Sequence, residues 1–199
     1  MEKEYRKIKL GPLSTSDREL KDLLKAWLII SIAFGLVLRK NFTSTWMSFV
    51  IAAIAVGSGF LLHELAHKVV AQRYHYFAEF RAFDEMLFLA LMMSLFGVVF
   101  VAPGAVMIFT ESIQRNKNGK ISAAGPAMNF ILAGLFFLVA ITTTGFLKIV
   151  GQYGFQVNAW LGLFNLIPVW NFDGAKIWRW NKIVWSGMVI IGLLFVFII

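Results

Sequence analysis

Five long hydrophobic runs, each with few or no charged residues, take up most of this chain and limit the folds that it can adopt. Most of them approach the roughly 20 apolar residues that a helix needs to cross a lipid bilayer. Hydrophobic residues make up 59% of the sequence and charged residues only 15%, so the bilayer is the expected solvent. We therefore predict an all-α polytopic membrane protein with about five to six transmembrane helices. The runs cover residues 23–38, 46–62, 86–109, 121–147 and 183–199.

Residues 1 to 22 are polar, carry mixed charge and precede the first hydrophobic run. No small-residue cleavage site closes that run, so we interpret it as a first membrane helix and not as a cleaved signal peptide. The Lys and Arg content of residues 1 to 22 predicts a cytoplasmic N-terminal segment. Residues 23 to 199 are expected to form a single membrane-embedded domain.

The formal net charge of +8 would suggest a nucleic-acid partner if the protein were soluble. Here the basic residues lie in short loops beside hydrophobic runs, so we expect contact with the lipid bilayer and no nucleic acid. The chain has no cysteine, which excludes disulfides and thiolate metal sites. Any metal must therefore bind to histidine, carboxylate or amide side chains.

The hydrophobic run at residues 86 to 109 has two interpretations. If it crosses the membrane once, the basic loop ESIQRNKNGK at residues 111 to 120 lies outside, against the positive-inside bias. If it forms a re-entrant hairpin, that loop stays in the cytoplasm, and NFDGAK at residues 171 to 176 reaches the same side as HELAH at residues 63 to 67. We favour the hairpin, which is tolerated at membrane depth only where protein buries it or water reaches it.

Two short segments beside these runs are typical of β-strands. FAEFRAF at residues 77 to 83 alternates imperfectly between apolar and polar residues, and AVMIF at residues 105 to 109 follows Pro103 and Gly104. We predict a short membrane-embedded β element here. An exposed edge of such an element can pair with an extended segment of another chain.

Small residues in VGSGF, just before His63, and Gly162 suggest a close approach between the second helix and the helix that ends near Asn165. The alternative is that glycine is simply frequent in membrane helices.

The motif HELAH places His63 and His67 four residues apart, so both rings lie on one face of a helix and can reach one metal ion. Glu64 projects about 100° around the helix from His63, within reach of a water on that metal. This is the H-E-x-x-H pattern of two imidazole ligands and a general base. The alternative is a pair of interfacial histidines beside a paired glutamate. Three ionisable groups in an apolar helix favour the metal site, because each costs roughly 2.5 kcal/mol or more without a partner.

A catalytic zinc needs a third protein ligand and an open fourth position. Asp173 is the strongest candidate, because it directly follows an apolar helix and precedes Gly174, which permits an unusual turn. The alternative is a helix-terminal aspartate that pairs with Lys176 or Arg179. His75 lies among basic and tyrosine residues, as is typical of the membrane interface.

Three blocks, in this order, resemble the site-2 protease family of intramembrane zinc metalloproteases. They are HELAH at residues 63 to 67, AGPAMN at residues 124 to 129 and NLIPVWNFDG at residues 165 to 174. The resemblance implies a zinc ion held by His63, His67 and Asp173, with Glu64 as the catalytic base.

The resemblance also assigns roles to two asparagines. Asn165 is a candidate oxyanion stabiliser, and Asn129 a structural or substrate-positioning residue. The last block departs from the family pattern, which often has more prolines and a double glycine, and we expect no PDZ-like domain. These departures concern substrate contacts more than the ligand set.

We therefore expect an intramembrane zinc metalloprotease that hydrolyses peptide bonds in or near the transmembrane segments of membrane proteins. We place it in a prokaryotic cell membrane as a multi-pass protein, with its N-terminus and active site toward the cytoplasm. One alternative is a scaffold that keeps the zinc for stability while regulating membrane partners. Another is a metal transporter, although no second polar cluster that could form an ion route is evident.

Overall fold

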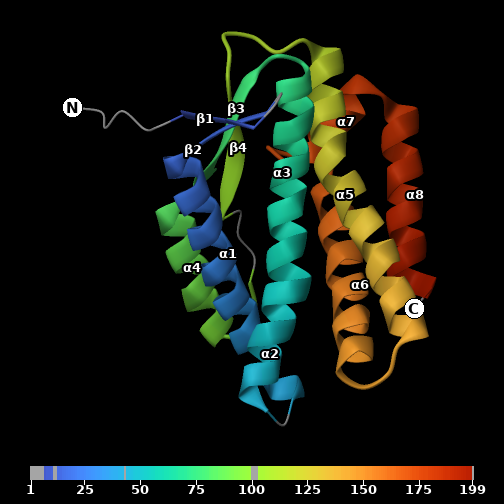
Figure 1. The fold of residues 1–199 in the computed structure, drawn as a ribbon. Coiled ribbons are helices and arrows are strands. Elements are labelled where there is room, and N and C mark those ends of the chain that lie inside the picture. The colour runs from blue at the N-terminus through green and yellow to red at the C-terminus, as the bar shows by residue number, and fades with distance from the viewer. Residues whose placement is uncertain (1–6, 11–12, 43, 100–102, 199) are drawn as a thin grey trace.

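The computed structural model describes residues 7–10, 13–42, 44–99 and 103–198, most of which are helical (Figure 1). The first elements are β1 (Lys7–Leu10), β2 (Leu13–Ser16), α1 (Asp17–Leu38), the 3-10 helix η1 (Arg39–Asn41), α2 (Thr45–Ile51), the π-helix η2 (Ala52–Gly57) and α3 (Ser58–Arg73). They are followed by β3 (Phe77–Ala82), α4 (Asp84–Leu95), β4 (Gly104–Phe109), α5 (Arg115–Thr142), α6 (Gly145–Asn165), α7 (Asp173–Trp180) and α8 (Lys182–Ile198).

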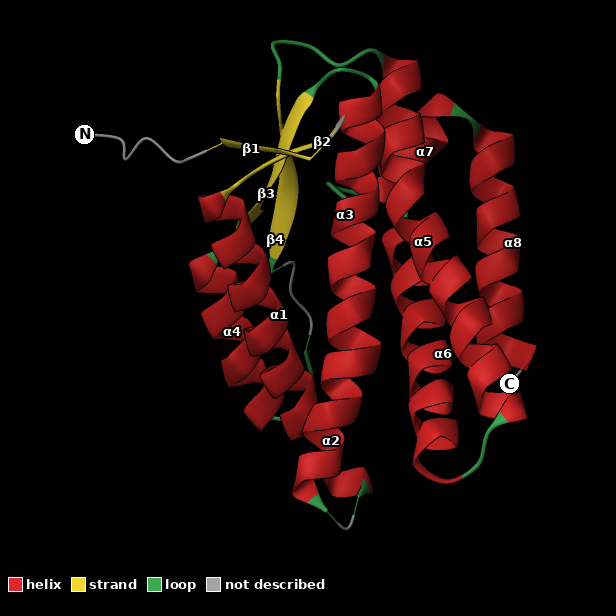
Figure 2. Cartoon of the chain, in the orientation of Figure 1, coloured by secondary structure: helices red, strands yellow, loops and turns green. Residues whose placement is uncertain are grey.

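Helix α3 stands between two groups of elements (Figures 1 and 2). Helices α1 and α4 and the two small sheets lie on one side, and α5, α6, α7 and α8 lie on the other. Because α3 contacts both β3 and β4 on one side and α5 and α6 on the other, its side chains can interact with either group.

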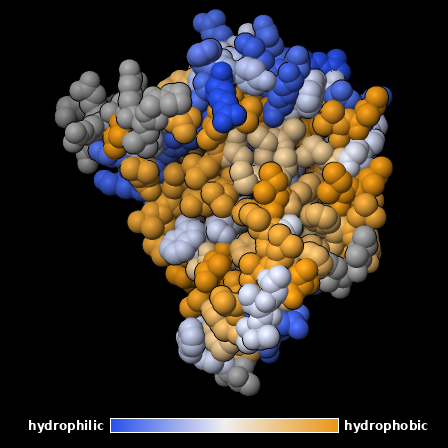
Figure 3. Space-filling model, turned by 45° about the vertical axis from the view of Figure 1, so that its right-hand side comes forward, coloured by the Kyte–Doolittle hydropathy of each residue, from blue (hydrophilic) through white to orange (hydrophobic). Residues whose placement is uncertain are grey.

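The surface of the molecule is largely apolar. Figure 3 shows a hydrophobic band across the helices, with hydrophilic residues gathered at the end where the sheets and α7 lie. Large apolar side chains remain exposed on several helices, among them Leu24, Phe88, Leu135 and Ile190. Such a surface suits a bilayer and not water.

In the part of the chain that the structure describes, two helices are long and apolar enough to cross a membrane, judged by length and composition. They extend over Thr45–Arg73, with 29 residues, and Arg115–Thr142, with 28 residues. The expected membrane character is thus supported, while the count of five to six transmembrane helices stays a prediction.

Within the described residues, two small antiparallel sheets accompany a mostly helical fold, as the prediction of helices with a short β element expected. Strand β3 pairs with β4 from Phe77 opposite Phe109 to Ala82 opposite Gly104, which confirms the strands expected in this region. Strand β1 pairs with β2 and was not predicted, although its sequence KIKL alternates between polar and apolar residues.

The hydrophobic run at residues 86 to 109 does not form one helix. Helix α4 ends at Leu95 and β4 begins at Gly104, while residues 100 to 102 lie outside the described part of the chain. A single crossing by one continuous helix is therefore excluded for this run.

Helix α1 begins at Asp17 and not near Leu23, because a capping interaction starts it earlier. The Ser16 side chain accepts a hydrogen bond of 3.2 Å from the backbone N–H of Glu19, and acidic residues occupy the first turn. Both features stabilise a helix N-terminus. The polar residues before the first hydrophobic run are thus partly helical.

Glu19 joins three elements through one buried carboxylate. Its Oε2 accepts hydrogen bonds from Lys68 Nζ at 2.5 Å and from Thr15 Oγ1 at 2.7 Å, and its Oε1 accepts one from the Phe80 N–H at 2.9 Å. Glu19 is fully buried and Lys68 nearly so. The carboxylate therefore ties α1 to α3 and to β3.

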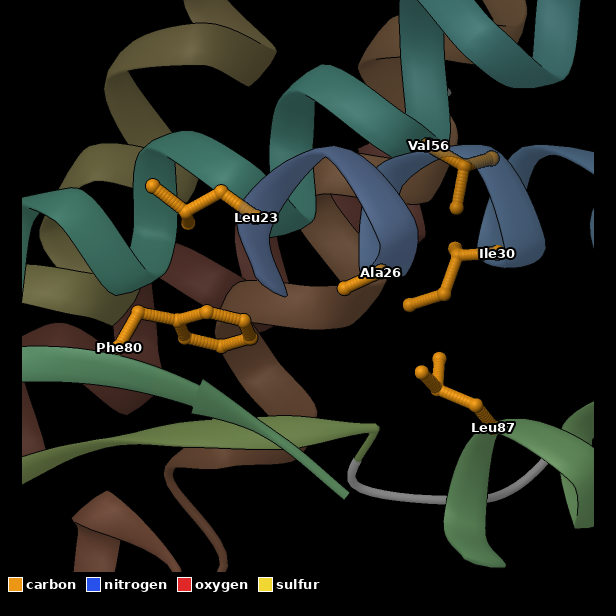
Figure 4. Close-up of a cluster of buried hydrophobic side chains, with 6 residues drawn as sticks. All are labelled: Leu23, Ala26, Ile30, Val56, Phe80 and Leu87. Atoms are coloured by element: carbon orange, nitrogen blue, oxygen red, sulfur yellow. The ribbon is translucent and has the colours of Figure 1, made fainter. Parts of the chain in front are cut away.

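A cluster of buried apolar side chains reinforces the same junction (Figure 4). It joins α1, η2, β3 and α4, so that β3 is held beside the helix that carries HELAH. Its members are Leu23, Ala26, Ile30, Val56, Phe80 and Leu87.

We predict that Glu19→Ala destabilises the protein by about 3 to 5 kcal/mol, because it leaves the buried Lys68 charge without its partner. The melting temperature of the detergent-solubilised chain measures this effect. The double variant Glu19→Ala/Lys68→Met should recover a large part of the loss, since it removes both charges. An unchanged melting temperature in Glu19→Ala would contradict the role of this ion pair.

Candidate metal centre

His63, His67 and Asp173 converge on one point, although the aspartate lies more than a hundred residues further along the chain. Asp173 Oδ2 is 3.3 Å from His63 Nε2 and 3.0 Å from His67 Nε2, and the two Nε2 atoms are 3.0 Å apart. All three side chains are buried. The residues that the sequence nominates as ligands thus lie together.

These donor atoms fit a zinc ion. Two ligand atoms on one tetrahedral zinc lie roughly 3.3 Å apart, given zinc–nitrogen bonds of about 2.0 to 2.1 Å. The separations of 3.0 to 3.3 Å among the three atoms are close to that value. Two histidines and one carboxylate are also a donor set found in catalytic zinc sites, which keep a fourth position open.

The Nδ1 atom of each histidine ring, called here the outer nitrogen because it faces away from the three-residue cluster, contacts another part of the protein. His67 Nδ1 lies 2.7 Å from the carbonyl oxygen of Ile121, and His63 Nδ1 lies 2.5 Å from Asn129 Oδ1. A carbonyl oxygen only accepts, so His67 Nδ1 carries the hydrogen and its Nε2 presents a lone pair. Such outer contacts fix the tautomer and orientation of metal-binding histidines.

Two glycines allow the backbone to approach the site. A Cβ atom on Gly125 would lie 2.4 Å from His67 Nε2 and 2.6 Å from His63 Cε1. A Cβ atom on Gly174 would lie 2.0 Å from the carbonyl oxygen of Leu166. Gly125 therefore lets α5 pack against both rings, and Gly174 lets the first turn of α7 pack against the backbone at the end of α6.

Asp173 is the first residue of α7, and its two carboxylate oxygens have different neighbours. Oδ2 faces the histidines, whereas Oδ1 lies 3.9 Å from Lys176 Nζ, so the pairing with Lys176 that the sequence offered as an alternative coexists with the cluster. As a metal ligand, Asp173 would bind through its ionised carboxylate.

Glu64 is buried next to the cluster and contacts the edge of a strand. Its Oε2 accepts a hydrogen bond of 3.1 Å from the backbone N–H of Val106 in β4. Val106 lies opposite Phe80, whose own N–H bonds to Glu19, so the two N–H groups of this pair point to opposite outer edges of the sheet. Strand β4 thus turns its free edge toward Glu64.

A cavity of about 720 Å³ opens beside these groups. It is lined on one side by β4 and on another by the segment that leads into α7, and it contains the candidate ligands together with Glu64 and Asn165. Asn165 lies at the end of α6, where its Nδ2 donates to the Leu161 carbonyl oxygen at 2.9 Å.

Asn129 does not line this cavity. It is fully buried behind His63, with its Oδ1 on the ring and its Nδ2 donating to the Gly59 carbonyl oxygen and to Asn158 Oδ1. The sequence analysis missed Asn158, although a polar residue seven positions before Asn165 in an apolar helix was a usable signal, because seven residues make two helical turns.

Known proteins match this chain in sequence. The model of peptidase family M50 matches residues 51 to 153, which include HELAH and AGPAMN. A protein of Methanocaldococcus jannaschii, named "Putative zinc metalloprotease", is 41% identical over 182 residues, which cover 89% of this chain and 93% of the relative. Rip3 of Mycobacterium tuberculosis, described in the same words, is 29% identical over 161 residues, which cover 78% of this chain and 37% of the relative. No solved structure matches the chain.

We predict that Gly125→Ala weakens zinc binding by about 10- to 100-fold, the range seen when groups around a metal site are disturbed. The added methyl group would intrude on both histidine rings. Zinc content per purified chain, with competition by a chelator, measures the effect. Gly134→Ala is the matched control in the same helix, because nothing lies within 4 Å of its new methyl group. Equal zinc binding by the two variants would contradict the described packing of α5.

Proposed function

We propose that this zinc metalloprotease, which belongs to the site-2 protease family (peptidase family M50), cleaves peptide bonds in or near the transmembrane segments of other membrane proteins. The observation that carries the proposal is the meeting of His63, His67 and Asp173 beside Glu64 in one cavity. The apolar surface of the helices supports a position of the molecule in a bilayer, with this cavity toward its hydrophilic end.

Each residue of the site has a separate proposed role in hydrolysis. His63, His67 and Asp173 would hold a zinc ion, which when bound supplies an activated water and positive charge for the reaction. Glu64 accepts the proton of the attacking water and passes it to the leaving amine. The Val106 N–H holds one carboxylate oxygen of Glu64, which leaves the other free for that proton.

Asn165 is the proposed second donor for the oxyanion. Its Nδ2 carries two hydrogens, of which the bond to Leu161 uses one. Because Asn165 lines the same cavity as Glu64, the second hydrogen can be directed at a reacting carbonyl group. Loss of one such donor typically costs about 2.7 to 4 kcal/mol of transition-state stabilisation.

The proposed membrane arrangement has five crossing segments: α1, the continuous helix of α2, η2 and α3, then α5, α6 and α8. These segments run alongside one another, which supports the arrangement (Figure 1). Helix α4 and strand β4 then form the proposed re-entrant element. Basic residues at the start of α5 and in α7 support a cytoplasmic position for the active-site end, in accord with the positive-inside rule.

We predict that Glu64→Gln lowers proteolysis by about 100-fold or more while the chain keeps its zinc, because the amide cannot act as a base. Asp173→Ala and His67→Ala should instead lose the zinc. Cleavage of single-span membrane proteins reconstituted with the enzyme in liposomes, beside zinc content, measures both effects. Glu85→Gln, an exposed glutamate in α4, is the control. Unchanged cleavage by Glu64→Gln would contradict the proposed mechanism and favour a scaffold.

Strand β4 is the proposed docking edge for an unwound substrate segment. A substrate helix hides its peptide groups in its own hydrogen bonds, so it must unwind before water can attack. An exposed strand edge can receive the unwound chain by adding it as a further strand. The outward N–H of Val106 implies that Gly104 and Ile108, two positions away on either side, also turn their N–H groups outward.

We predict that Ile108→Pro reduces cleavage by about tenfold without unfolding the sheet, because proline removes an outward donor and is tolerated at a strand edge. Met107→Pro should instead destabilise the sheet, since the Met107 N–H faces β3. Rates of cleavage and melting temperatures of both variants separate the two effects. If Ile108→Pro cleaves at the wild-type rate, substrate does not pair with this edge at that position.

A further inference from the structure

Asn158 is a buried polar residue of α6 that takes no part in the mechanism described above. It is fully buried, and it makes hydrogen bonds with three different elements. Its Nδ2 donates to the carbonyl oxygens of Ala55 at 3.2 Å and Gly154 at 2.9 Å, and its Oδ1 accepts from Asn129 Nδ2 at 3.0 Å.

The direction of these hydrogen bonds follows from chemistry. The carbonyl oxygens of Ala55 and Gly154 can only accept, so the nitrogen of the Asn158 amide must face them. The amide oxygen of Asn158 then faces Asn129 and can only accept in its turn. Asn129 must therefore direct its nitrogen toward Asn158, and also toward the carbonyl oxygen of Gly59 at 3.2 Å.

The same logic extends to the metal ligand. With its nitrogen turned away, Asn129 presents only an oxygen to His63 Nδ1, 2.5 Å away. That oxygen accepts, so His63 Nδ1 must carry the hydrogen, and the lone pair of His63 lies on Nε2, the atom that faces Asp173. Backbone carbonyl oxygens thus determine the tautomer of His63 through two asparagine side chains.

We propose that Asn158 is a positioning residue for the metal centre, which acts on His63 through Asn129. The inference rests on the proposed function, because it assumes that His63 binds zinc. His67 obtains the same orientation from one carbonyl group, that of Ile121. At His63 Nδ1 the acceptor is instead the side-chain amide oxygen of Asn129, so two amide side chains, from α6 through α5, fix the orientation of this ring.

The backbone around Asn158 is adapted to the relay. A Cβ atom on Gly59 would lie 2.5 Å from Asn158 Oδ1, so only glycine leaves room for the amide beside α3. Ala55 belongs to the π-helical segment η2, a local widening of the helix that is frequent at functional sites. Gly59, which belongs to the VGSGF segment, therefore makes room for the Asn158 side chain in addition to allowing close helix packing.

The test compares zinc affinities of full-length variants in detergent, measured by competition with a chelator. Asn158→Leu keeps the volume but removes the acceptor for Asn129, and we expect about tenfold weaker zinc binding. Asn158→Asp keeps an acceptor at that position and should bind zinc more tightly than Asn158→Leu. Gln156→Leu, which removes an exposed amide from the same helix, is the matched control and should bind zinc as wild type does.

A double variant distinguishes the relay from a purely structural role. If Asn158 acts through Asn129, then Asn129→Leu/Asn158→Leu should weaken zinc binding by about as much as Asn129→Leu alone. Should Asn158→Leu not fold, Gly59→Ala tests the same contact by displacing the amide. Wild-type zinc affinity in the Asn158 variant, or losses that add in the double variant, would overturn the proposal. Zinc absent from the wild-type chain would instead overturn the proposed function.

Discussion

The burial of ionisable side chains on one apolar helix is the constraint on which the rest of this structure depends. Helix α3 carries two histidines, a glutamate and a lysine among hydrophobic residues, and each of these groups is costly in a bilayer without a partner. Within the described residues, every buried side-chain nitrogen and oxygen has a hydrogen-bond partner. The partners come from elements that are distant in sequence. The need to provide hydrogen-bond partners for the side chains of α3 therefore determines much of the tertiary arrangement.

The polar residues of α3 form two adjacent stripes that face different parts of the protein. His63 and His67 face α5 and α7, where Asn129, Ile121 and Asp173 meet them. The residues of the other stripe recur every four positions and therefore share the neighbouring face of the helix. That face lies against the sheets and α1. This stripe consists of Glu64, Lys68 and Gln72, which bond to Val106, to Glu19 and to Ser14 and Ala78. One helix thus joins a metal-binding half to a β-containing half.

The sequence nominated His63, His67 and Asp173 as candidate ligands, and the structure brings these three side chains together. Two histidines four residues apart in an apolar helix indicate a metal site, the position of Asp173 before Gly174 nominated it as the third ligand, and the family resemblance implied the same ligand set. The strands at residues 77–82 and 104–109 were also predicted, from the alternation in FAEFRAF and from the position of AVMIF after Pro103 and Gly104. The hydrogen-bond partners of the two histidine Nδ1 atoms were not predicted. Every residue has a backbone carbonyl group, so a sequence does not show that the one of Ile121 contacts a histidine ring. The start of α1 at Asp17 was not predicted, because the hydropathy of a sequence does not show the capping interaction between Ser16 and Glu19.

The bond between Glu64 and Val106 places the proposed base and the proposed substrate edge in a fixed register. Strand residues advance by about 3.3 to 3.4 Å, so the outward N–H groups of Gly104 and Ile108 lie roughly 7 Å on either side of that of Val106. Because Glu64 occupies the central donor, a paired substrate would bond to the edge on either side of it. The peptide group opposite Val106 would then lack a partner from the strand and face the carboxylate. Under the proposed function, the strand that binds the substrate therefore also determines which peptide bond meets Glu64.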